Sequence, residues 1–291
     1  EMMNNTEQMP TSHFLDLIQT TVNILSTELN KEMNGTGTLN PQIINSCVSN
    51  FEKLTQNPRY ITPNSAQSIV RSIEHIVDAV IGDSNHELKL EGQYQQIAST
   101  VSNVYLSVNK SESDSGLKRQ IFNVLDQLSS IVMSESAVGA PETVITTNLV
   151  DIVIKVHHAE QIAGASFNTS RSKVQLPSTL SGVLQPNTRY ALEMMSFSSD
   201  DNPYSDSMSS QNISTSVVSV RIMSNDNRKV KIQELSAPIE LVIRKSGLNL
   251  VDVDHSDNNN YRYECRYWDE TTNNTWDHSG CYLFDQTETE I

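Results

Sequence analysis

The sequence predicts an α+β protein of two domains, a helical bundle over residues 1–137 followed by an antiparallel β-sandwich over residues 138–291. Three observations support this fold class. Apolar residues recur every three or four positions through residues 12–136, as they do along one face of a helix. From residue 150 an alternation of period two replaces this pattern. Short apolar runs then follow one another between turn-forming clusters, without a helical pattern between them.

Five amphipathic helices are expected between residues 12 and 136. Thr11 and Ser12 are caps for the first, while Asn40-Pro41 and Thr62-Pro63 each place an N-cap residue before a proline at the first helical position. We expect the third helix to end in a left-handed cap at Gly82. Linkers are expected at residues 34–39, 57–61 and 110–116.

The apolar residues of each helix form a single stripe, which indicates packing in a bundle core rather than a partner-binding groove. Cys47 lies within the second stripe and is therefore expected to be a buried free thiol. The five stripes are Phe14, Ile18, Val22, Leu25 and Leu29; Ile44, Cys47, Val48, Phe51 and Leu54; Ile69, Ile73, Ile76, Val77 and Val80; Ile97, Val101, Val104, Tyr105 and Val108; and Leu117, Ile121, Val124, Leu125, Leu128 and Val132.

Short strands are expected after the turn at residues 137–141, which marks the domain boundary. Residues 150–156 alternate as a half-buried strand, with Asp151, Val153 and Lys155 on the face opposite to the apolar one. The remaining predicted strands are residues 174–176, 190–194, 218–222, 230–235, 239–243 and 261–267. The predicted turns are residues 185–187, 200–203, 225–227 and 257–260.

Composition excludes several classes of partner. The formal charge of -15 argues against nucleic acid and against docking on an anionic bilayer, because no basic stripe is present. No apolar run reaches the roughly 20 residues of a membrane helix, so direct membrane insertion of this segment is not expected. The chain begins with Glu1 and lacks the pattern of a signal peptide, so we expect it to be a processed piece or a segment of a longer protein.

Signatures of catalysis are absent from the sequence, so no enzyme activity, catalytic residue or cofactor is expected. His157 and His158 are adjacent on a predicted strand and point to opposite faces, which favours a structural role over a shared zinc ion. The acidic cluster Asp252, Asp254 and Asp257 offers oxygen ligands of the kind that Ca²⁺ binds. It lacks the glycine and terminal glutamate of an EF-hand loop, so a solvated turn is favoured and no metal site is expected.

Asn-x-Ser/Thr sequons suggest an extracellular or cell-surface glycoprotein. All six are expected to lie at a terminus, turn or loop. They are Asn4, Asn34, Asn109, Asn168, Asn212 and Asn273.

The most distinctive stretch is the end of the chain, where Cys265-x-x-Trp268 is followed by Trp276-x-x-x-Gly280-Cys281. This spacing predicts a compact hairpin that turns at Asn273-Asn274-Thr275 and is covered by the two indoles. Strand geometry permits a disulfide between Cys265 and Cys281.

The two cysteines, the two tryptophans and Gly280 of this stretch resemble the first half of the GPCR proteolysis site, the GPS motif of the GAIN domain found in adhesion receptors and polycystin-1-like proteins. That motif reads C-x-x-W, a turn, W-x-x-x-G-C, and then C-x-C-x-H-L-S/T. Residues 218–222, 230–235 and 238–241 resemble the strands before the motif, and residues 173–177 are similar to a polycystin-type segment. A helical subdomain before a β-sandwich is also the GAIN layout, so the resemblance extends over nearly the whole chain.

The resemblance implies an extracellular module that cleaves its own backbone between Leu and Ser/Thr, with His as the base. Residues 1–291 offer no candidate for base or nucleophile, and the C-x-C half would begin at about Ile291. In the family, Cys265 and Cys281 would each bond a cysteine of that pair. Without the pair they would bond each other or remain reduced.

The leading interpretation is a GAIN-like ectodomain of a larger membrane-anchored protein, which serves as a stalk or shield and self-cleaves just beyond this chain. The implied partners are the rest of its own polypeptide, including a C-terminal GPS strand, and extracellular proteins or a channel subunit; the polycystin resemblance implies a ciliary location. The alternative is a non-cleaving structural subunit of an extracellular filament or cell coat. A lectin-like calcium-binding sandwich ranks third, and a hydrolase last.

Overall fold

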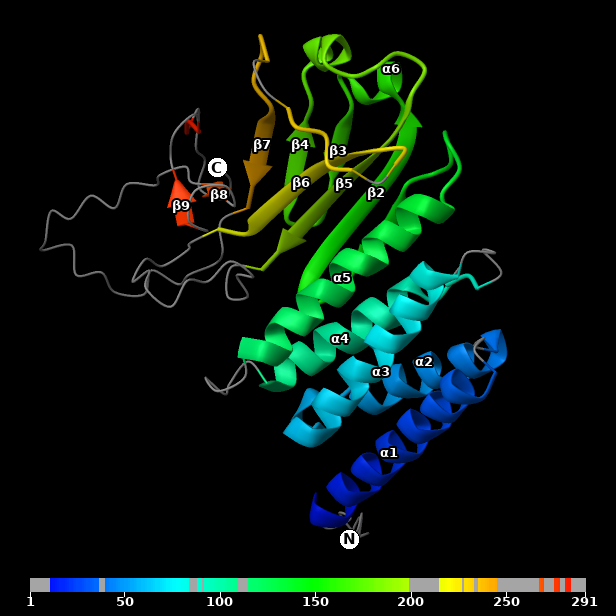
Figure 1. Cartoon of the computed structure of the whole chain (residues 1–291). Coiled ribbons are helices and arrows are strands. Elements are labelled where there is room, and N and C mark those ends of the chain that lie inside the picture. The colour runs from blue at the N-terminus through cyan, green and yellow to red at the C-terminus, as the bar shows by residue number, and fades with distance from the viewer. Residues whose placement is uncertain are drawn as a thin grey trace, which may run out of the picture. The chain divides into compact units, whose positions relative to one another are not determined.

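The computed structural model describes residues 11–36, 40–83, 88–90, 92–108, 115–198, 215–226, 228–232, 235–244, 267–269, 275–277 and 281–283. Helices are followed by antiparallel sheets, which confirms the predicted α+β class (Figure 1). Contacts divide the chain into two compact units, Glu1–Val150 and Asp151–Ile291. The predicted boundary at residues 137/138 lies between the last long helix and the first strand.

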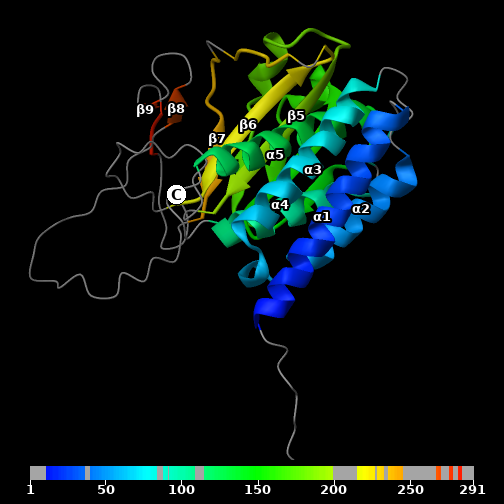
Figure 2. The same ribbon diagram turned by 60° about the horizontal axis from the view of Figure 1, so that its bottom comes forward.

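All five predicted helices are present in the first unit (Figure 2). α1 packs on α3, α3 on α5, and α2 on α4. The predicted stripes face the resulting core, where Phe51 and Ile73 are fully buried. The helices are α1 (Thr11–Thr36), α2 (Pro41–Thr55), α3 (Pro63–Gly82), α4 (Tyr94–Val108) and α5 (Ser115–Glu135).

Two predicted N-caps are confirmed by their hydrogen bonds. The Asn40 side chain accepts a hydrogen bond of 2.9 Å from the backbone N–H of Gln42, and Thr62 Oγ1 accepts one of 3.1 Å from the N–H of Ser65. Both cap residues have extended backbone, so the chain enters each helix through its proline.

The helix ends differ from prediction in several places. Gly82 is not among the residues with positive φ, so the left-handed cap is wrong; α3 ends at Gly82, and the C-cap residue Asp83 has extended backbone and donates its N–H to Val80 O. α1 runs to Thr36, into the predicted first linker. In the second linker Pro58–Tyr60 form a turn of 3₁₀ helix, η1, which begins with a proline after the Asn57 cap. In α2 Thr55 is buried, whereas Leu54 is only half-buried.

The strands among the described residues form three sheets. The order is β1-β2-β5-β6 in the four-stranded sheet, β3-β4-β7 in the three-stranded sheet, and β8-β9 in the two-stranded sheet. The strands are β1 (Thr143–Thr146), β2 (Val150–His158), β3 (Ser166–Asn168), β4 (Ser172–Gln175), β5 (Arg189–Phe197), β6 (Val217–Ser224), β7 (Glu240–Ile243), β8 (Tyr267–Asp269) and β9 (Thr275–Asp277). Two short helices, α6 (Ala159–Ile162) and the 3₁₀ helix η2 (Ser178–Gly182), connect strands of the second unit.

In the second unit an apolar core joins β2, β5 and β6 of the four-stranded sheet to the three-stranded sheet, as a sandwich requires. Val153 of β2 and Leu192 of β5 meet Phe167 of β3 and Val174 of β4 in this core, and all four are at most 1% exposed. Ile162 of α6 closes part of it. The predicted sandwich is therefore confirmed.

Strand details were predicted less well. Residues 230–232 and 235 are not in a strand: Val230 N–H donates to Ile222 O at 2.7 Å, after which the apolar side chains pack against the core without a ladder. β1 and the three-residue β3 were not predicted. The turns at 185–187 and 225–226 are confirmed, and Asn187 has a φ of 56°. The predicted turns at 200–203 and 257–260 and strand residues 261–266 lie outside the described residues.

The Thr62 cap gives a test of the helical unit. Thr62→Ala removes the acceptor for Ser65 N–H and should lower the free energy of unfolding by about 1 kcal/mol. Chemical denaturation measures the loss. The matched control is Thr27→Ala, which removes an exposed hydroxyl within α1 that bonds only Asn23 O. Equal stability of the Thr62→Ala variant and the wild type would contradict the capping role.

Candidate functional site

The C-terminal motif contains an antiparallel hairpin. β8 pairs with β9 in a register that places Trp268 directly opposite Trp276 and Tyr267 opposite Asp277. The predicted pairing of the two motif segments is confirmed. Thr275 belongs to β9, where it pairs with Asp269, so it does not belong to the predicted turn.

The structure describes only some residues of the predicted motif. Cys281 is half-buried, and Tyr282 after it is 85% exposed. Cys265, Gly280 and the predicted turn residues Asn273 and Asn274 lie outside the described residues, as do Asp252, Asp254 and Asp257 of the acidic cluster. Among the described residues, no group of three His, Cys, Asp or Glu side chains is placed to hold a metal ion.

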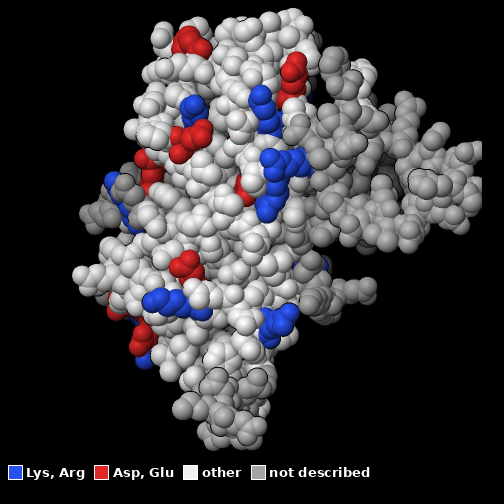
Figure 3. Space-filling model, turned by 180° about the vertical axis from the view of Figure 1, so that it is seen from behind, with Lys and Arg blue, Asp and Glu red and all other residues white. Residues whose placement is uncertain are grey.

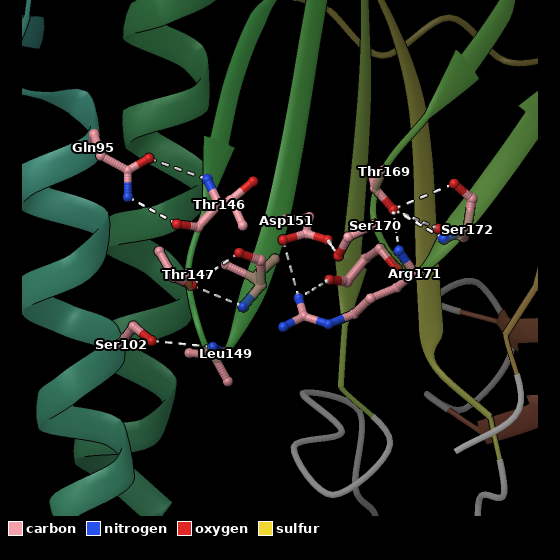
Figure 4. Close-up of polar contacts among 12 residues, drawn as sticks. Gln95, Ser102, Thr146, Thr147, Leu149, Asp151, Thr169, Ser170, Arg171 and Ser172 are labelled. Carbon is pink, nitrogen blue, oxygen red and sulfur yellow. Dashed lines mark hydrogen bonds and ion pairs between the residues drawn. The ribbon is translucent and has the colours of Figure 1, made fainter. Parts of the chain in front are cut away.

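A buried charge fixes the sandwich next to β2. Asp151 is 1% exposed; its carboxylate accepts a hydrogen bond from Ser170 Oγ and lies 3.3 Å from Arg171 Nη1 (Figure 4). The same Nη1 donates to the backbone carbonyl of Ser196 at 3.2 Å. Burial of a carboxylate is costly unless it is paired and hydrogen-bonded; here Ser170 hydrogen-bonds Oδ2, while Oδ1 accepts no hydrogen bond from the described residues and is compensated by the ion pair with Arg171. Because these contacts come from β2, the β3–β4 turn and β5, they tie the two sheets together.

The β3–β4 turn holds Arg171 in place. Thr169 Oγ1 accepts hydrogen bonds from the backbone N–H groups of Arg171 at 3.1 Å and Ser172 at 3.0 Å (Figure 4). The carbonyl of Arg171 in turn accepts from Arg244 N–H, directly after β7, at 2.9 Å. The turn therefore connects the charge pair to the third strand of its own sheet.

This cluster was not predicted, because Asp151 was placed on the exposed face of a half-buried strand. That expectation is wrong: Asp151 and Val153 share the face that meets the sandwich core, while Ile152 and Ile154 are buried on the other face. β2 is therefore buried on both sides through most of its length. A carboxylate inside an otherwise apolar strand was the available signal.

A second buried ion pair lies across β5 and β6. Glu193 and Arg221 are directly opposite in the register, and Arg221 donates to both carboxylate oxygens, at 2.7 Å from Nη2 to Oε1. Glu193 is 1% exposed. Such a bidentate pair adds geometric specificity to strand pairing.

The two adjacent histidines have separate surroundings. His157 is half-buried and its Nδ1 lies 3.2 Å from Gln161 Oε1, while His158 is exposed. Burial and, to a lesser degree, the nearby Lys155 lower the pKa of His157. The ring of His157 thus links β2 to α6 through the Gln161 side chain.

Cys47 is a free thiol that is 2% exposed, as predicted. Burial, together with the charge of Glu28, raises the pKa of this thiol. It therefore remains protonated and unreactive at neutral pH.

Two sequons lie in regular structure rather than in the predicted loops. Asn34 is in the last turn of α1, and Asn168 is the last residue of β3 with an exposed side chain. Asn4, Asn109, Asn212 and Asn273 lie outside the described residues.

The first unit has a polar contact of its own beside β1. The Gln95 side chain of α4 donates to Thr146 O at 2.8 Å and accepts from Thr146 N–H at 3.1 Å, and Ser102 Oγ accepts from Leu149 N–H at 3.1 Å (Figure 4). Together these bonds fix β1 and the turn after it against α4.

Charges on the face shown in Figure 3 are scattered, with Lys and Arg side chains interspersed among Asp and Glu. None of the described helices is long and apolar enough to cross a membrane.

The C-terminal half of the chain matches a known family. Residues 144–291 match the family model described as GPS: GAIN subdomain B. A search of curated proteins found no match. The matched range begins within β1 and extends over the sandwich and the hairpin.

Arg171 provides the test of the buried charge cluster. Arg171→Met leaves the Asp151 carboxylate buried without its counter-charge, so we expect a loss of about 3 kcal/mol in unfolding free energy, the lower end for a broken buried pair because Arg171 is 20% exposed. Chemical denaturation measures this loss. The matched control is Arg228→Met, which breaks an exposed pair with Asp226 and should cost nothing measurable. Similar losses in both variants would contradict the structural role of the Asp151 cluster.

Proposed function

This chain belongs to the GPS family of GAIN subdomain B domains, and from this premise we propose that it is the extracellular module of a larger membrane-anchored protein, where it serves as a stalk or shield. The family match over residues 144–291 is the observation that carries the proposal. GPS domains are typical of the ectodomains of membrane receptors. A helical unit before the sandwich agrees with the GAIN layout that the sequence resembles.

Composition supports an extracellular setting. The chain has six sequons and a formal charge of -15, which favours a soluble, well-separated surface. We further propose that its partners are the remainder of its own polypeptide, including a C-terminal GPS strand, and extracellular proteins or a channel subunit. A ciliary location is the finer proposal that the polycystin-like segment at residues 173–177 supports.

We also propose that a disulfide between Cys265 and Cys281 closes the hairpin. In support, β8 and β9 pair with Trp268 opposite Trp276, between the two cysteines in sequence. Among the described cysteines Cys47 is the free one, and Cys281 is not a free thiol. Pairing with a downstream C-x-C segment, as in the family, is the alternative.

Self-cleavage needs the C-x-C-x-H-L-S/T half of the motif, which residues 1–291 do not contain. Within these residues no enzyme activity is proposed. Whether the full-length protein contains that half of the motif therefore decides between the cleaving module and the non-cleaving structural subunit.

Surface labelling of intact cells tests the proposed location. The full-length natural protein with an epitope tag before Thr11 should bind antibody without permeabilisation, and co-staining of the axoneme tests the ciliary proposal. Labelling that requires permeabilisation would overturn the extracellular function.

Intact mass tests cleavage. Under the GAIN-like proposal, the full-length protein should give two fragments that co-purify and separate only on denaturation. One uncleaved mass would leave the structural subunit as the function of this fold.

Cysteine variants test the hairpin disulfide. Cys265→Ser should sharply reduce secretion, since loss of a native disulfide from a small extracellular element costs about 2–5 kcal/mol. The matched control is Cys47→Val, which replaces a buried free thiol by a similar apolar group and should be secreted normally. Secretion of Cys265→Ser at the wild-type level would exclude the disulfide as a folding requirement.

A further inference from the structure

β3 is the end strand of the three-stranded sheet, and its outer edge is open in the described part of the chain. Its inner edge pairs with β4, where Leu176 N–H donates to Ala165 O at 2.9 Å and Thr169 N–H donates to Ser172 O at 2.8 Å. Hydrogen-bonding groups alternate between the two edges of an antiparallel strand. The backbone N–H and C=O groups of Ser166 and Asn168 therefore point to the open edge.

Beside β1, β6 and β7, at least one backbone group has a partner among the described residues. Gln95 satisfies both backbone groups of Thr146 on β1. Beside β6, Met223 bridges to Lys229. At the end of β7, the carbonyl of Arg244 accepts from Ser216 N–H at 3.4 Å. An unpaired strand edge such as the outer edge of β3 invites pairing with another chain.

A sequon lies on the open edge. Asn168-Thr169-Ser170 begins at the last residue of β3, and the Asn168 side chain is exposed because its neighbour Phe167 points into the core. A glycan there would be attached to one of the two residues whose backbone faces the edge. Glycans are bulky and solubilising, so one at this position would obstruct an incoming strand.

We propose that an N-linked glycan on Asn168 covers the open edge of β3 and prevents pairing of this edge with a second copy of the chain. The proposal rests on the extracellular function proposed above, because only a secreted chain meets the glycosylation machinery. It assigns the Asn168 sequon a role that the extracellular location alone does not imply.

Site mapping of the secreted full-length protein tests occupancy. After enzymatic removal of N-glycans, mass spectrometry should find position 168 converted to aspartate in most molecules. Occupied sequons elsewhere with Asn168 unmodified would overturn this inference and leave the extracellular function intact. No occupied sequon in a protein that stays inside the cell would overturn both.

Association measurements test the role of the glycan. Asn168→Gln should raise the associated fraction severalfold in sedimentation at high concentration, with the thermal midpoint unchanged. The matched control, Asn34→Gln, removes a sequon on the helix α1, which is not part of a sheet, and should not associate.

Asn168→Lys provides a rescue, because a lysine on an edge strand also opposes strand pairing. It lacks the sequon but should remain as monomeric as the wild type. An Asn168→Gln variant that stays monomeric, or an Asn168→Lys variant that associates as much as Asn168→Gln, would overturn the edge-covering role.

Discussion

The buried carboxylate of Asp151 is the constraint on which the sandwich depends. A charge that is 1% exposed must be compensated, and Arg171 and Ser170 compensate it from the β3–β4 turn. Arg171 also binds the Ser196 carbonyl of β5, and its own carbonyl accepts from Arg244 beyond β7. Because these partners come from both sheets, the position of one sheet on the other is set by directional bonds as well as by apolar packing.

The two buried ion pairs constrain different strands of the four-stranded sheet. Asp151 lies on β2 and is linked to β5 through Arg171, which donates to the Ser196 carbonyl, whereas Glu193 of β5 pairs with Arg221 of β6. A one-residue slip of β6 would separate Glu193 from Arg221 and leave a buried charge unpaired. Apolar residues such as Met194 and Met195 tolerate several packings, so we attribute the unique register of these buried strands largely to the polar pairs.

Helices and the general order of the chain could be predicted because their signals are local. A proline after Asn40 or Thr62 fixes a helix start within a few residues, and each apolar stripe specifies its own buried face. The strands depend on distant partners. Residues 230–235 have a strand-like sequence without a ladder, and the three residues of β3 pair only because β4 follows them across the tight turn that Thr169 stabilises. The motif spacing around Trp268 and Trp276 predicted a hairpin correctly, since both strands and their turn lie within one short stretch. The Asp151 cluster was not predicted: a carboxylate within an apolar strand was a signal, but its partners Ser170 and Arg171 lie on a turn distant in sequence, and no local pattern pairs that turn with β2.

β1 and the turn after it are bonded by side chains that lie outside the residues matched by the family model. The family match begins at residue 144, yet the outer edge of β1 is satisfied by the Gln95 side chain, which reproduces both hydrogen bonds of a neighbouring strand at Thr146. Ser102, two turns further along α4, holds the turn before β2 through Leu149 N–H. A fragment limited to the matched residues would lack both side chains and would expose an unpaired strand edge. Within the first unit, α4 thus supplies the hydrogen-bond partners that the outer edge of β1 and the turn after it require.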